Sequence, residues 1–273
     1  MIQSKKKLYE FLEMTAEELN VLLDQIESLY KIRLQPKIKF GKPQMILKPY
    51  CASRVRQLII PFYKLKNCQH KLNALLQQIT LPYYFHGSIT GKSNVTNAFS
   101  HIENDYFLTV DIKNFFPRIN NNIVYHTLVK LGFSADVSRI LTKLTTTKRQ
   151  LPQGAPTSTT LANLVMLNTS HKLYTLAKTN NIQLTVFLDD LTFSSKAPFK
   201  NLVNEFLLIL NKENYKIAHN KINYSNNICE ITGIFIKGKK LSLSYKMQNK
   251  AKRNKEYARY NKYIQEYQSK HIG

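Results

Sequence analysis

The sequence predicts an α+β protein in which a few antiparallel strands are accompanied by amphipathic helices. One observation is a pair of apolar, β-favouring runs, residues 184–188 and 191–193, which enclose two acids and are typical of a β-hairpin. The other is a set of capping signals and apolar stripes, the longest of which predicts a helix over residues 158–179. With 273 residues, the chain is long enough for a large core, built as one domain or as two or three closely packed subdomains.

The N-terminal half is expected to mix helices with short strands. Thr15 and Glu18 stand at capping-box spacing, and the apolar stripe behind them predicts a helix that continues to Tyr30. The residues after Pro61 carry an apolar face up to Ile79, which predicts a second helix that begins at this proline. Further elements are expected at residues 54–61 (strand), 94–101 (short helix), 106–112 (strand) and 121–131 (helix).

The C-terminal half is expected to place the hairpin between helices. After the hairpin, the pattern predicts a helix near residues 201–213, a strand over 215–225, a second hairpin over 230–244 and a helical tail over 245–273. In this tail, tyrosines alternate with lysines and arginines. This mixture suits either a nucleic-acid backbone or a solvated helix that is packed by its tyrosines.

The charge balance favours a polyanionic partner. Forty Lys and Arg residues against seventeen Asp and Glu give a formal net charge of +23 and a pI near 9.8. No long apolar segment accompanies these charges, so nucleic acid is the expected partner and a membrane is not. The N-terminus lacks the apolar run of a signal peptide and the three cysteines match no zinc pattern, so we expect a cytoplasmic protein with reduced thiols.

Three acids stand where predicted strands end. Asp189 and Asp190 lie together between the two runs of the hairpin, and Asp111 ends an earlier apolar strand, ahead of bulky aromatic residues. Two like charges about 5 Å apart repel by roughly 3 kcal/mol at an effective dielectric of about 20. The pair therefore predicts a positive partner, for which a divalent metal ion is the obvious candidate. The alternative is a solvated turn in which the two acids only reverse the chain.

Three blocks in one order carry a resemblance to a known family. They are TVDIKNFFPRI (109–119), LPQGAPTSTTLAN (151–163) and FLDDLTFSS (187–195). Together they resemble the reverse transcriptases, in particular the bacterial ones, and the similarity covers roughly residues 48–243. The resemblance implies a right-hand polymerase with fingers, a palm of antiparallel sheet plus helices, and a small helical thumb. It places the N-terminal helices and fingers in residues 1–105, the palm in 106–236 and a basic thumb or tail in 237–273.

The same resemblance implies a site for two Mg²⁺ ions. Asp111 and Asp189 match the principal metal ligands of the family, Asp190 a weaker third ligand, and the carbonyl of Ile112 a backbone ligand. Two such ions would activate a primer hydroxyl and stabilise the leaving pyrophosphate. Lys221 is expected either to protonate that pyrophosphate or to be an ordinary surface lysine.

By resemblance, four further residues are expected to surround the incoming deoxynucleotide. Gln153 and Gly154 belong to the nucleotide-contacting LPQG loop, and Arg56 of the fingers is expected to contact the triphosphate. Phe116, five residues after Asp111, matches the bulky residue that excludes a sugar 2′-hydroxyl. The alternative for Phe116 is an ordinary buried core position.

Two shorter patterns narrow the resemblance to the retron reverse transcriptases. NAFSH, from Asn97 to His101, is similar to their Asn-Ala-x-x-His element, and Ile231-Thr232-Gly233 is similar to their Val-Thr-Gly element. Residue chemistry by itself favours a structural role for Asn97 and His101, which share one helix face. The resemblance implies an RNA-holding surface made of Asn97, His101, Thr232, Gly233, Lys250, Lys252 and Arg253.

The expected function is therefore RNA-directed DNA synthesis. A retron enzyme copies a structured non-coding RNA that is also the primer, starts from an internal 2′-hydroxyl, leaves a branched RNA–DNA product and acts with an effector protein in phage defence. One alternative is another bacterial reverse transcriptase, of group II intron or other defence type, with conventional priming. A second alternative, from a different class, is a non-catalytic RNA-binding scaffold.

Overall fold

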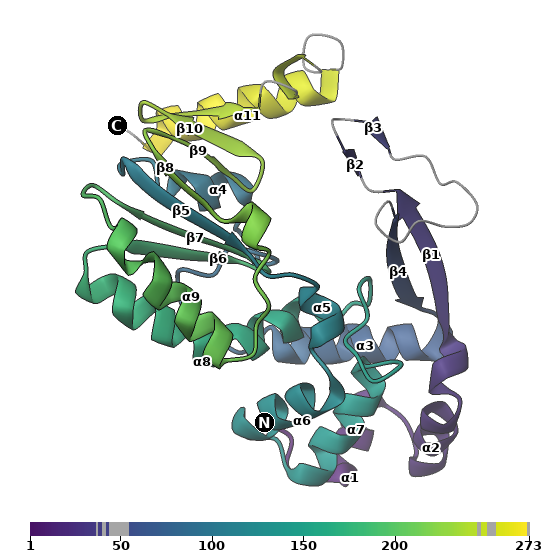
Figure 1. Ribbon diagram of the computed structural model, residues 1–273. Coiled ribbons are helices and arrows are strands. Elements are labelled where there is room, and N and C mark those ends of the chain that lie inside the picture. Colours follow the sequence, from purple (N-terminus) through teal and green to yellow (C-terminus); the bar gives the residue numbers. More distant parts are fainter. Residues whose placement is uncertain (37, 40–41, 44–54, 245–246, 250–254, 272–273) are drawn as a thin grey trace. The chain divides into compact units, whose positions relative to one another are not determined.

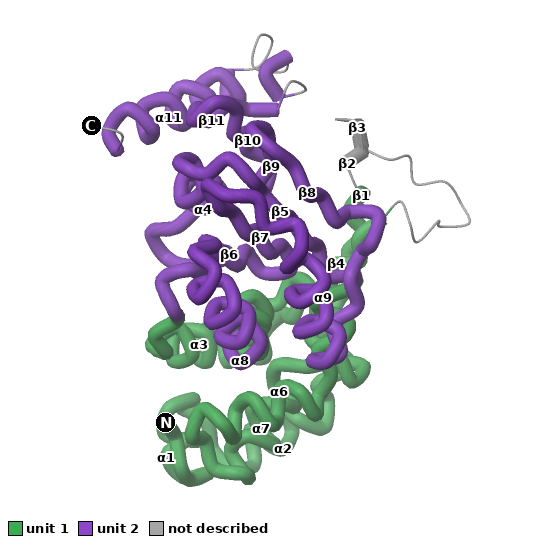
Figure 2. The backbone as a smooth tube through the Cα atoms, turned by 60° about the vertical axis from the view of Figure 1, so that its left-hand side comes forward, with its two compact units in different colours: residues 1–81, 114–166 green, residues 82–113, 167–273 purple. Residues whose placement is uncertain are grey.

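The computed structural model describes residues 1–36, 38–39, 42–43, 55–244, 247–249 and 255–271. The chain forms two compact units that alternate along the sequence (Figure 2). Unit 1 comprises residues 1–81 and 114–166, and unit 2 comprises residues 82–113 and 167–273. Helices and antiparallel sheets are mixed, which confirms the α+β class. The division into fingers, palm and thumb stays a prediction.

Unit 1 is mainly helical, with one long two-stranded ribbon (Figure 1). Its ribbon pairs β1 with β4 in antiparallel register, from Tyr30 opposite Pro61 to Pro36 opposite Val55. Its elements are α1 (Lys5–Leu12), α2 (Ala16–Asp24), η1 (Ile26–Leu29), β1 (Tyr30–Pro36), β2 (Ile38–Lys39), β3 (Lys42–Pro43), β4 (Val55–Pro61), α3 (Tyr63–Leu76), α5 (Phe115–Arg118), α6 (Asn121–Lys130), α7 (Ala135–Thr145) and the first part of α8 (Ser158–Thr179).

The start of α2 and the whole of α8 agree with the sequence. Thr15 Oγ1 accepts a hydrogen bond from the Glu18 N–H at 3.1 Å and Glu18 Oε2 accepts one from the Thr15 N–H at 2.9 Å, so the predicted capping box is present. Helix α2 does not continue to Tyr30 as predicted. It ends at Asp24, and Tyr30 instead begins β1, because pairing with β4 satisfies its backbone.

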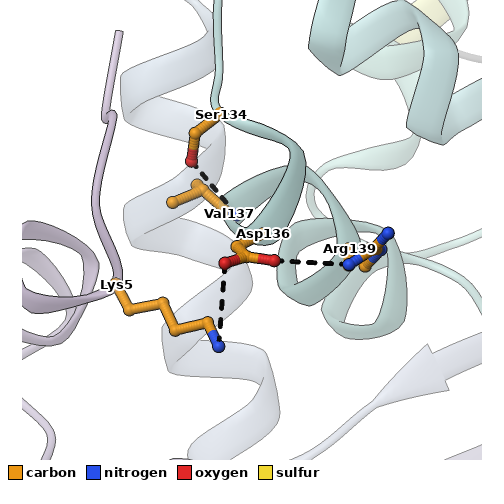
Figure 3. A network of polar contacts seen from close by, with 5 residues as sticks. All are labelled: Lys5, Ser134, Asp136, Val137 and Arg139. Atoms are coloured by element: carbon orange, nitrogen blue, oxygen red, sulfur yellow. Dashed lines mark hydrogen bonds and ion pairs between the residues drawn. The ribbon is translucent and has the colours of Figure 1, made fainter.

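An exposed charge network joins α1 to the start of α7 (Figure 3). Ser134 caps α7, since its hydroxyl accepts a hydrogen bond from the Val137 N–H at 3.4 Å. In the first turn, Asp136 lies 3.9 Å from the ammonium of Lys5 and 3.3 Å from a guanidinium nitrogen of Arg139. These side chains are more than half exposed, so each ion pair contributes at most about 1 kcal/mol.

Unit 2 contains two antiparallel sheets (Figure 1). One has four strands in the order β6-β7-β5-β8, and the other has three strands in the order β11-β10-β9. The elements are α4 (Asn94–Phe99), β5 (Tyr106–Asp111), the second part of α8, β6 (Gln183–Phe187), β7 (Asp190–Ser195), η2 (Lys200–Leu202), α9 (Val203–Lys212), η3 (His219–Lys221), β8 (Asn223–Asn226), β9 (Ile228–Ile231), β10 (Ile234–Lys237), β11 (Lys240–Leu243) and α11 (Lys255–His271).

The four-stranded sheet has two chemically different faces, because side chains alternate along each strand. On the face toward α9, here the α9 face, Phe193 packs on Phe206 with ring centroids 4.2 Å apart. The α9 face carries Leu108, Val110, Leu184, Val186, Leu191 and Phe193. The opposite face, here the α4 face, carries Phe107, Thr109, Asp111, Thr185, Asp190, Thr192 and Ser194.

The C-terminal helix α11 covers the three-stranded sheet. Its Ile264 is fully buried in a core with residues of α4, β9, β10 and β11. Gln268 binds the backbone of the outer strand and its turn: Oε1 accepts from the Leu241 N–H at 2.8 Å and Nε2 donates to the Lys239 carbonyl at 3.0 Å. The predicted helical tail is therefore present, over Lys255–His271.

Cys68 and Cys229 are buried free thiols, whereas Cys51 lies outside the described residues. Within the part of the chain that the structure describes, the helices are too short or too polar to cross a membrane.

Candidate active site

Three acidic residues meet at one end of the four-stranded sheet. The β6–β7 hairpin (183–195), here called the catalytic hairpin after the predicted role of its acids, turns through Leu188 and Asp189, so Asp190 is the first residue of β7. In the register of β5 and β7, Asp190 stands directly opposite Asp111. The carbonyl of Asp189 accepts a hydrogen bond from the Ile112 N–H at 2.9 Å, which fixes the turn against the end of β5.

The turn holds Leu188 in the left-handed region, with φ at 58°. A branched, non-glycine residue adopts this conformation at a cost of order 1–3 kcal/mol. The neighbouring chain supports it: Val186 exchanges backbone hydrogen bonds with Tyr84 and His86, both at 2.8 Å. Gly87 follows so closely that a Cβ atom on it would lie 2.7 Å from the Leu188 nitrogen and 2.9 Å from the Phe187 carbonyl carbon. Only glycine allows this approach.

The acids create a strongly negative field at this end of the sheet. Burial, together with the negative charges of Asp189 and Asp111, raises the pKa of Asp190 to about 7. Lys221 acts in the opposite sense on Asp190, and its ammonium lies 2.6 Å from Asp111 Oδ1. Like charges held together in this way are most stable with a cation among them.

A short turn rather than a strand delivers Lys221. The predicted strand over 215–225 was wrong in its first part, because η3 (His219–Lys221) precedes β8. Before this turn, the Lys113 N–H donates to the Lys216 carbonyl at 2.7 Å and the Ala218 N–H donates to the Asp111 carbonyl at 2.9 Å. These bonds bring η3 alongside the end of β5, which places the ammonium of Lys221 on Asp111.

The donor chemistry of this cluster fits Mg²⁺, which takes oxygen ligands and few of them from protein. Asp111, Asp189 and Asp190 supply carboxylate oxygens, and the pKa of Asp190 is raised first by burial and then by the two neighbouring acids, whose repulsion a cation would relieve. Among the described residues, no group of three or more His, Cys, Asp or Glu side chains is arranged as a ready metal site. The two-ion site, with the Ile112 carbonyl as a further ligand, stays a prediction.

The residues predicted to contact the nucleotide belong to unit 1. The carbonyl of Gln153 accepts a hydrogen bond from the Ile59 N–H at 2.8 Å, which ties the LPQG loop to β4. Gly154 has φ at 116°, and a Cβ atom there would lie 3.4 Å from Leu58 Cβ. Because side chains alternate along β4, the exposed Arg56 shares the face of Leu58. Sequence reasoning missed this contact between the loop and the strand.

Phe116 follows a residue in the left-handed conformation, Asn114, and is buried, with only 8% of its surface exposed. Its ring meets that of Phe115 edge-on, with centroids 5.8 Å apart. Its burial fits a core position and is equally compatible with a rigid steric barrier. The roles of Arg56, Phe116, Gln153 and Gly154 in nucleotide binding stay predictions.

The residues predicted to hold RNA divide into three groups. Asn97 and His101 are buried inside unit 2, with 1% and 0% of their surfaces exposed, and both have hydrogen-bond partners in the protein. Thr232 and Gly233 form the turn between β9 and β10. The basic tail residues Lys250, Lys252 and Arg253 lie outside the described residues. RNA contact by any of them stays a prediction.

The chain is similar to several known proteins. Residues 41–249 match the family described as reverse transcriptase (RNA-dependent DNA polymerase). The Retron Se72 reverse transcriptase of Salmonella heidelberg (strain 579083-10) is 28% identical over 277 residues, which cover 96% of this chain and 68% of that protein. The Retron Ec86 reverse transcriptase of Escherichia coli is 30% identical over 195 residues, which cover 70% of this chain and 61% of that protein.

A third relative, the Retron Mx65 reverse transcriptase of Myxococcus xanthus, is 32% identical over 165 residues, or 54% of this chain and 39% of that protein. Among solved structures, apo telomerase from Candida tropicalis, truncated from its C-terminal domain, aligns with a TM-score of 0.56 at 13% identity, over 79% of this chain and 55% of the telomerase. Telomerase from Candida albicans aligns with a TM-score of 0.52 at 12% identity, over 79% of this chain and 46% of the telomerase. These two likenesses concern the fold alone.

Proposed function

Because the chain belongs to the reverse transcriptase family, we propose that the acids at the end of the unit 2 sheet form a polymerase site that serves a retron. The family match confirms the expected enzyme class, an RNA-directed DNA polymerase, and the three bacterial relatives confirm the retron-type resemblance. The observation that carries the proposal is the pairing of Asp111 with Asp190 beside Asp189, with Lys221 bound to Asp111.

Nucleotide addition is a phosphoryl transfer, and it depends on positioning and charge neutralisation more than on covalent catalysis. Two bound Mg²⁺ ions would supply an activated primer hydroxyl and would stabilise charge on the leaving pyrophosphate. The protein fixes its carboxylates through the β5–β7 ladder and through the bond from the Ile112 N–H to the Asp189 carbonyl. We assign to the ammonium of Lys221, which lies 2.6 Å from Asp111 Oδ1, the role of neutralising or protonating the leaving group.

The retron hypothesis specifies the template, the primer and the substrates of this reaction. We propose that the template is a structured non-coding RNA that also primes the reaction from an internal 2′-hydroxyl, with deoxynucleotides as substrates and a branched RNA–DNA molecule as product. Any ribose hydroxyl held in line with the α-phosphate of the nucleotide can attack, so a terminal 3′-hydroxyl is not required. A protein effector, a role in phage defence and a cytoplasmic location belong to the same proposal.

The net charge of +23 supports RNA as the partner, and the exposed cations of α11 lie on a helix whose tyrosines Tyr260, Tyr263 and Tyr267 contact one another in sequence. Tyr260 and Tyr267 also pack against the core of unit 2, so they serve the packing of the helix, and Tyr263, with 45% of its surface exposed, is the aromatic residue of the three that is open to nucleic acid. A reverse transcriptase with conventional priming would use the same acids. A non-catalytic scaffold would have no need of them, so the cluster of Asp111, Asp189 and Asp190 disfavours it.

Asp189→Asn tests the catalytic assignment. Removing one carboxylate should abolish DNA synthesis on poly(rA) primed with oligo(dT) in Mg²⁺, while binding of this template–primer stays nearly unchanged, because the turn keeps its backbone bonds. Asp136→Asn is the matched control, since it makes the same chemical change on an exposed acid of unit 1. Normal synthesis by Asp189→Asn would refute the assignment.

The primer proposal has its own test. Nucleic acid that copurifies with the protein is freed of protein, digested with RNase and then treated with an enzyme that opens 2′,5′ bonds. A mobility shift of the DNA only after the second treatment supports branched priming. DNA that runs free after denaturation alone, or that carries an ordinary 3′–5′ junction, contradicts it and leaves the broader polymerase proposal intact.

A further inference from the structure

The turn between β9 and β10 has an unfavourable conformation. Ile231 pairs with Ile234, so the turn consists of Thr232 and Gly233 alone, with φ at 47° and 86°. Positive φ at both positions is the geometry of a type I′ turn, for which Asn-Gly is the preferred sequence. A β-branched residue such as Thr232 is an outlier at positive φ, and it persists only where the surroundings hold it.

Helix α4 supplies those surroundings. Asn97 Nδ2 donates to Thr232 Oγ1 at 3.3 Å, and Asn94 Nδ2 donates to the Thr232 carbonyl at 3.2 Å. The other amide atom of Asn94, Oδ1, accepts a hydrogen bond from the Tyr260 hydroxyl at 2.8 Å, which ties α4 to α11. The turn, α4 and the C-terminal helix are therefore joined by side-chain hydrogen bonds that residue types alone did not reveal.

The far end of the same segment joins the catalytic hairpin. His101 Nδ1 lies 2.6 Å from Ser194 Oγ on β7, and His101 Nε2 lies 2.7 Å from Thr185 Oγ1 on β6. A neutral imidazole has one donor and one acceptor nitrogen, so it can connect two hydroxyl groups. Burial, with a smaller contribution from His86, lowers the pKa of His101 to about 3, which keeps the ring neutral near pH 7. Ser194 also accepts a hydrogen bond from Asn104 Nδ2 at 2.7 Å.

The two hydroxyl partners of His101, Ser194 and Thr185, lie on the α4 face, which also carries Asp190. Ser194 is on the same strand and the same face as Asp190, and Thr185 pairs with Thr192 between them. The helix is rigidly seated, because Val95 and Ala98 are fully buried with Phe107, Ile231 and Ile264 in one core. A shift of α4 therefore moves both the turn and the strands that hold the acids.

We propose that α4 and its continuation to His101 couple the Thr232–Gly233 turn and α11 to the catalytic hairpin, so that Asn97, His101 and Thr232 act as positioning residues. They serve the polymerase reaction from inside unit 2 without touching RNA. This inference rests on the proposed function for its effect on catalysis. It gives one structural role to two short patterns that are far apart in the sequence, NAFSH and ITG, because Asn97 of one bonds Thr232 of the other.

The test compares Thr232→Val with Thr232→Ser. Valine keeps the branched shape but removes the hydroxyl that Asn97 binds, whereas serine keeps the hydroxyl. With poly(rA) primed by oligo(dT), Thr232→Val should lower kcat about tenfold through misplacement of the acids, with KM for dTTP and Kd for the template–primer unchanged. Thr232→Ser should restore kcat.

A second readout needs no activity. Amide hydrogen exchange of the RNA-free protein should accelerate over residues 183–195 in Thr232→Val, although the substituted turn is not in that hairpin. His101→Leu, which cannot bond Ser194 or Thr185, should produce the same acceleration, and His101→Gln should reverse much of it. Should His101→Leu fail to fold, the two Thr232 variants decide the question.

The outcomes are distinct. Weakened template–primer binding with unchanged kcat would mean that these side chains contact RNA, and it would overturn the inference. Unchanged exchange over 183–195 in Thr232→Val would also overturn it, because the coupling would be absent. A wild-type protein that synthesises no DNA would refute the proposed function, while the exchange measurement would still decide the coupling.

Discussion

The two faces of the four-stranded sheet are held by different kinds of contact. On the α9 face the buried side chains are hydrocarbons, and Phe193 and Phe206 pack ring on ring. On the α4 face buried hydroxyls meet the imidazole of His101, and the strands end in acids. Hydrophobic contacts are strong but non-directional, whereas hydrogen bonds in a buried network fix direction. We infer that the α9 face supplies stability and that the α4 face supplies position.

The largest expected effect is on the α9 face. Phe193 is fully buried, so Phe193→Ala leaves a cavity and should lower the free energy of unfolding by about 3–5 kcal/mol. Urea denaturation would measure it, and Phe193→Leu, which refills most of the volume, is the control. A loss below about 1 kcal/mol would show that this face does not carry the stability we assign to it.

A smaller energetic effect, this time on the rate of DNA synthesis, is expected at Gly87, which supports the turn formed by Leu188 and Asp189. In Gly87→Ala the new Cβ would meet the Leu188 nitrogen at 2.7 Å, so the turn must move. A displacement of about 1 Å at reacting groups costs on the order of 100-fold in kcat. Single-turnover synthesis would measure this.

Gly91→Ala is the control for Gly87→Ala, because Gly91 has positive φ but no atom within 4 Å of its Cβ position. It should cost some stability and leave kcat nearly unchanged. Equal rate losses in the two variants would show that backbone strain, and not close approach to Leu188, sets the rate.

Acid should lower the free energy of unfolding through buried titratable groups near the α4 face. Burial lowers the pKa of His86 to about 4 and of His101 to about 3, from 6.5 for each. As the pH falls below 6.5, these two histidines each bind a proton in the unfolded chain. In the folded chain they stay neutral until about pH 4. Asp190 opposes this, because its pKa is raised to about 7 and the folded state binds its proton first. The net difference is one proton, so stability should fall by about 1.4 kcal/mol per pH unit between these limits.

Urea denaturation at several pH values would measure this slope. His101→Gln removes one of the two histidines and should make stability nearly independent of pH in that range. Asp190→Asn removes the opposing group and should steepen the fall. Identical slopes in all three proteins would contradict the assignment of these buried groups.

The smallest effect is expected at the surface of unit 1. Asp136→Asn removes both ion pairs of Figure 3 and should change the free energy of unfolding by less than about 1 kcal/mol, because the partners are more than half exposed. The loss should shrink further in high salt, which screens such pairs. A loss that persists in 1 M salt, about 3 Å in screening length, would show an additional structural role for Asp136.

The sequence predicted best what depends on near neighbours. The capping box of Thr15 and Glu18, the bounds of α8 and the hairpin with Asp189 in its turn follow from spacing within a few residues. Tyr30 was misassigned because its partner, Pro61, comes from a distant strand. The helices α1 and α7 were not predicted. The hairpin predicted around Lys237 and Gly238 is the pair β10–β11, and the pairing of β9 with β10 was missed.

The candidate site shows the same limit. The three acids were identified by their places at strand ends, and the structure brings them to one end of one sheet. The support of this site was not predictable, because the close approach that requires Gly87 is to Leu188, which is far along the chain. His101 was identified as polar on a helix face, but its hydroxyl partners lie more than 80 residues away.

Gln268 has a consequence for solubility. Strand β11 is the outer strand of its sheet, and an outer strand presents unpaired backbone groups that invite pairing with another molecule. The side chain of Gln268 takes up the Leu241 N–H and the Lys239 carbonyl, while α11 packs beside the same strand. A shortened chain that ends before α11 would expose this edge, and we expect it to self-associate through β11 at concentrations where the full chain stays dispersed.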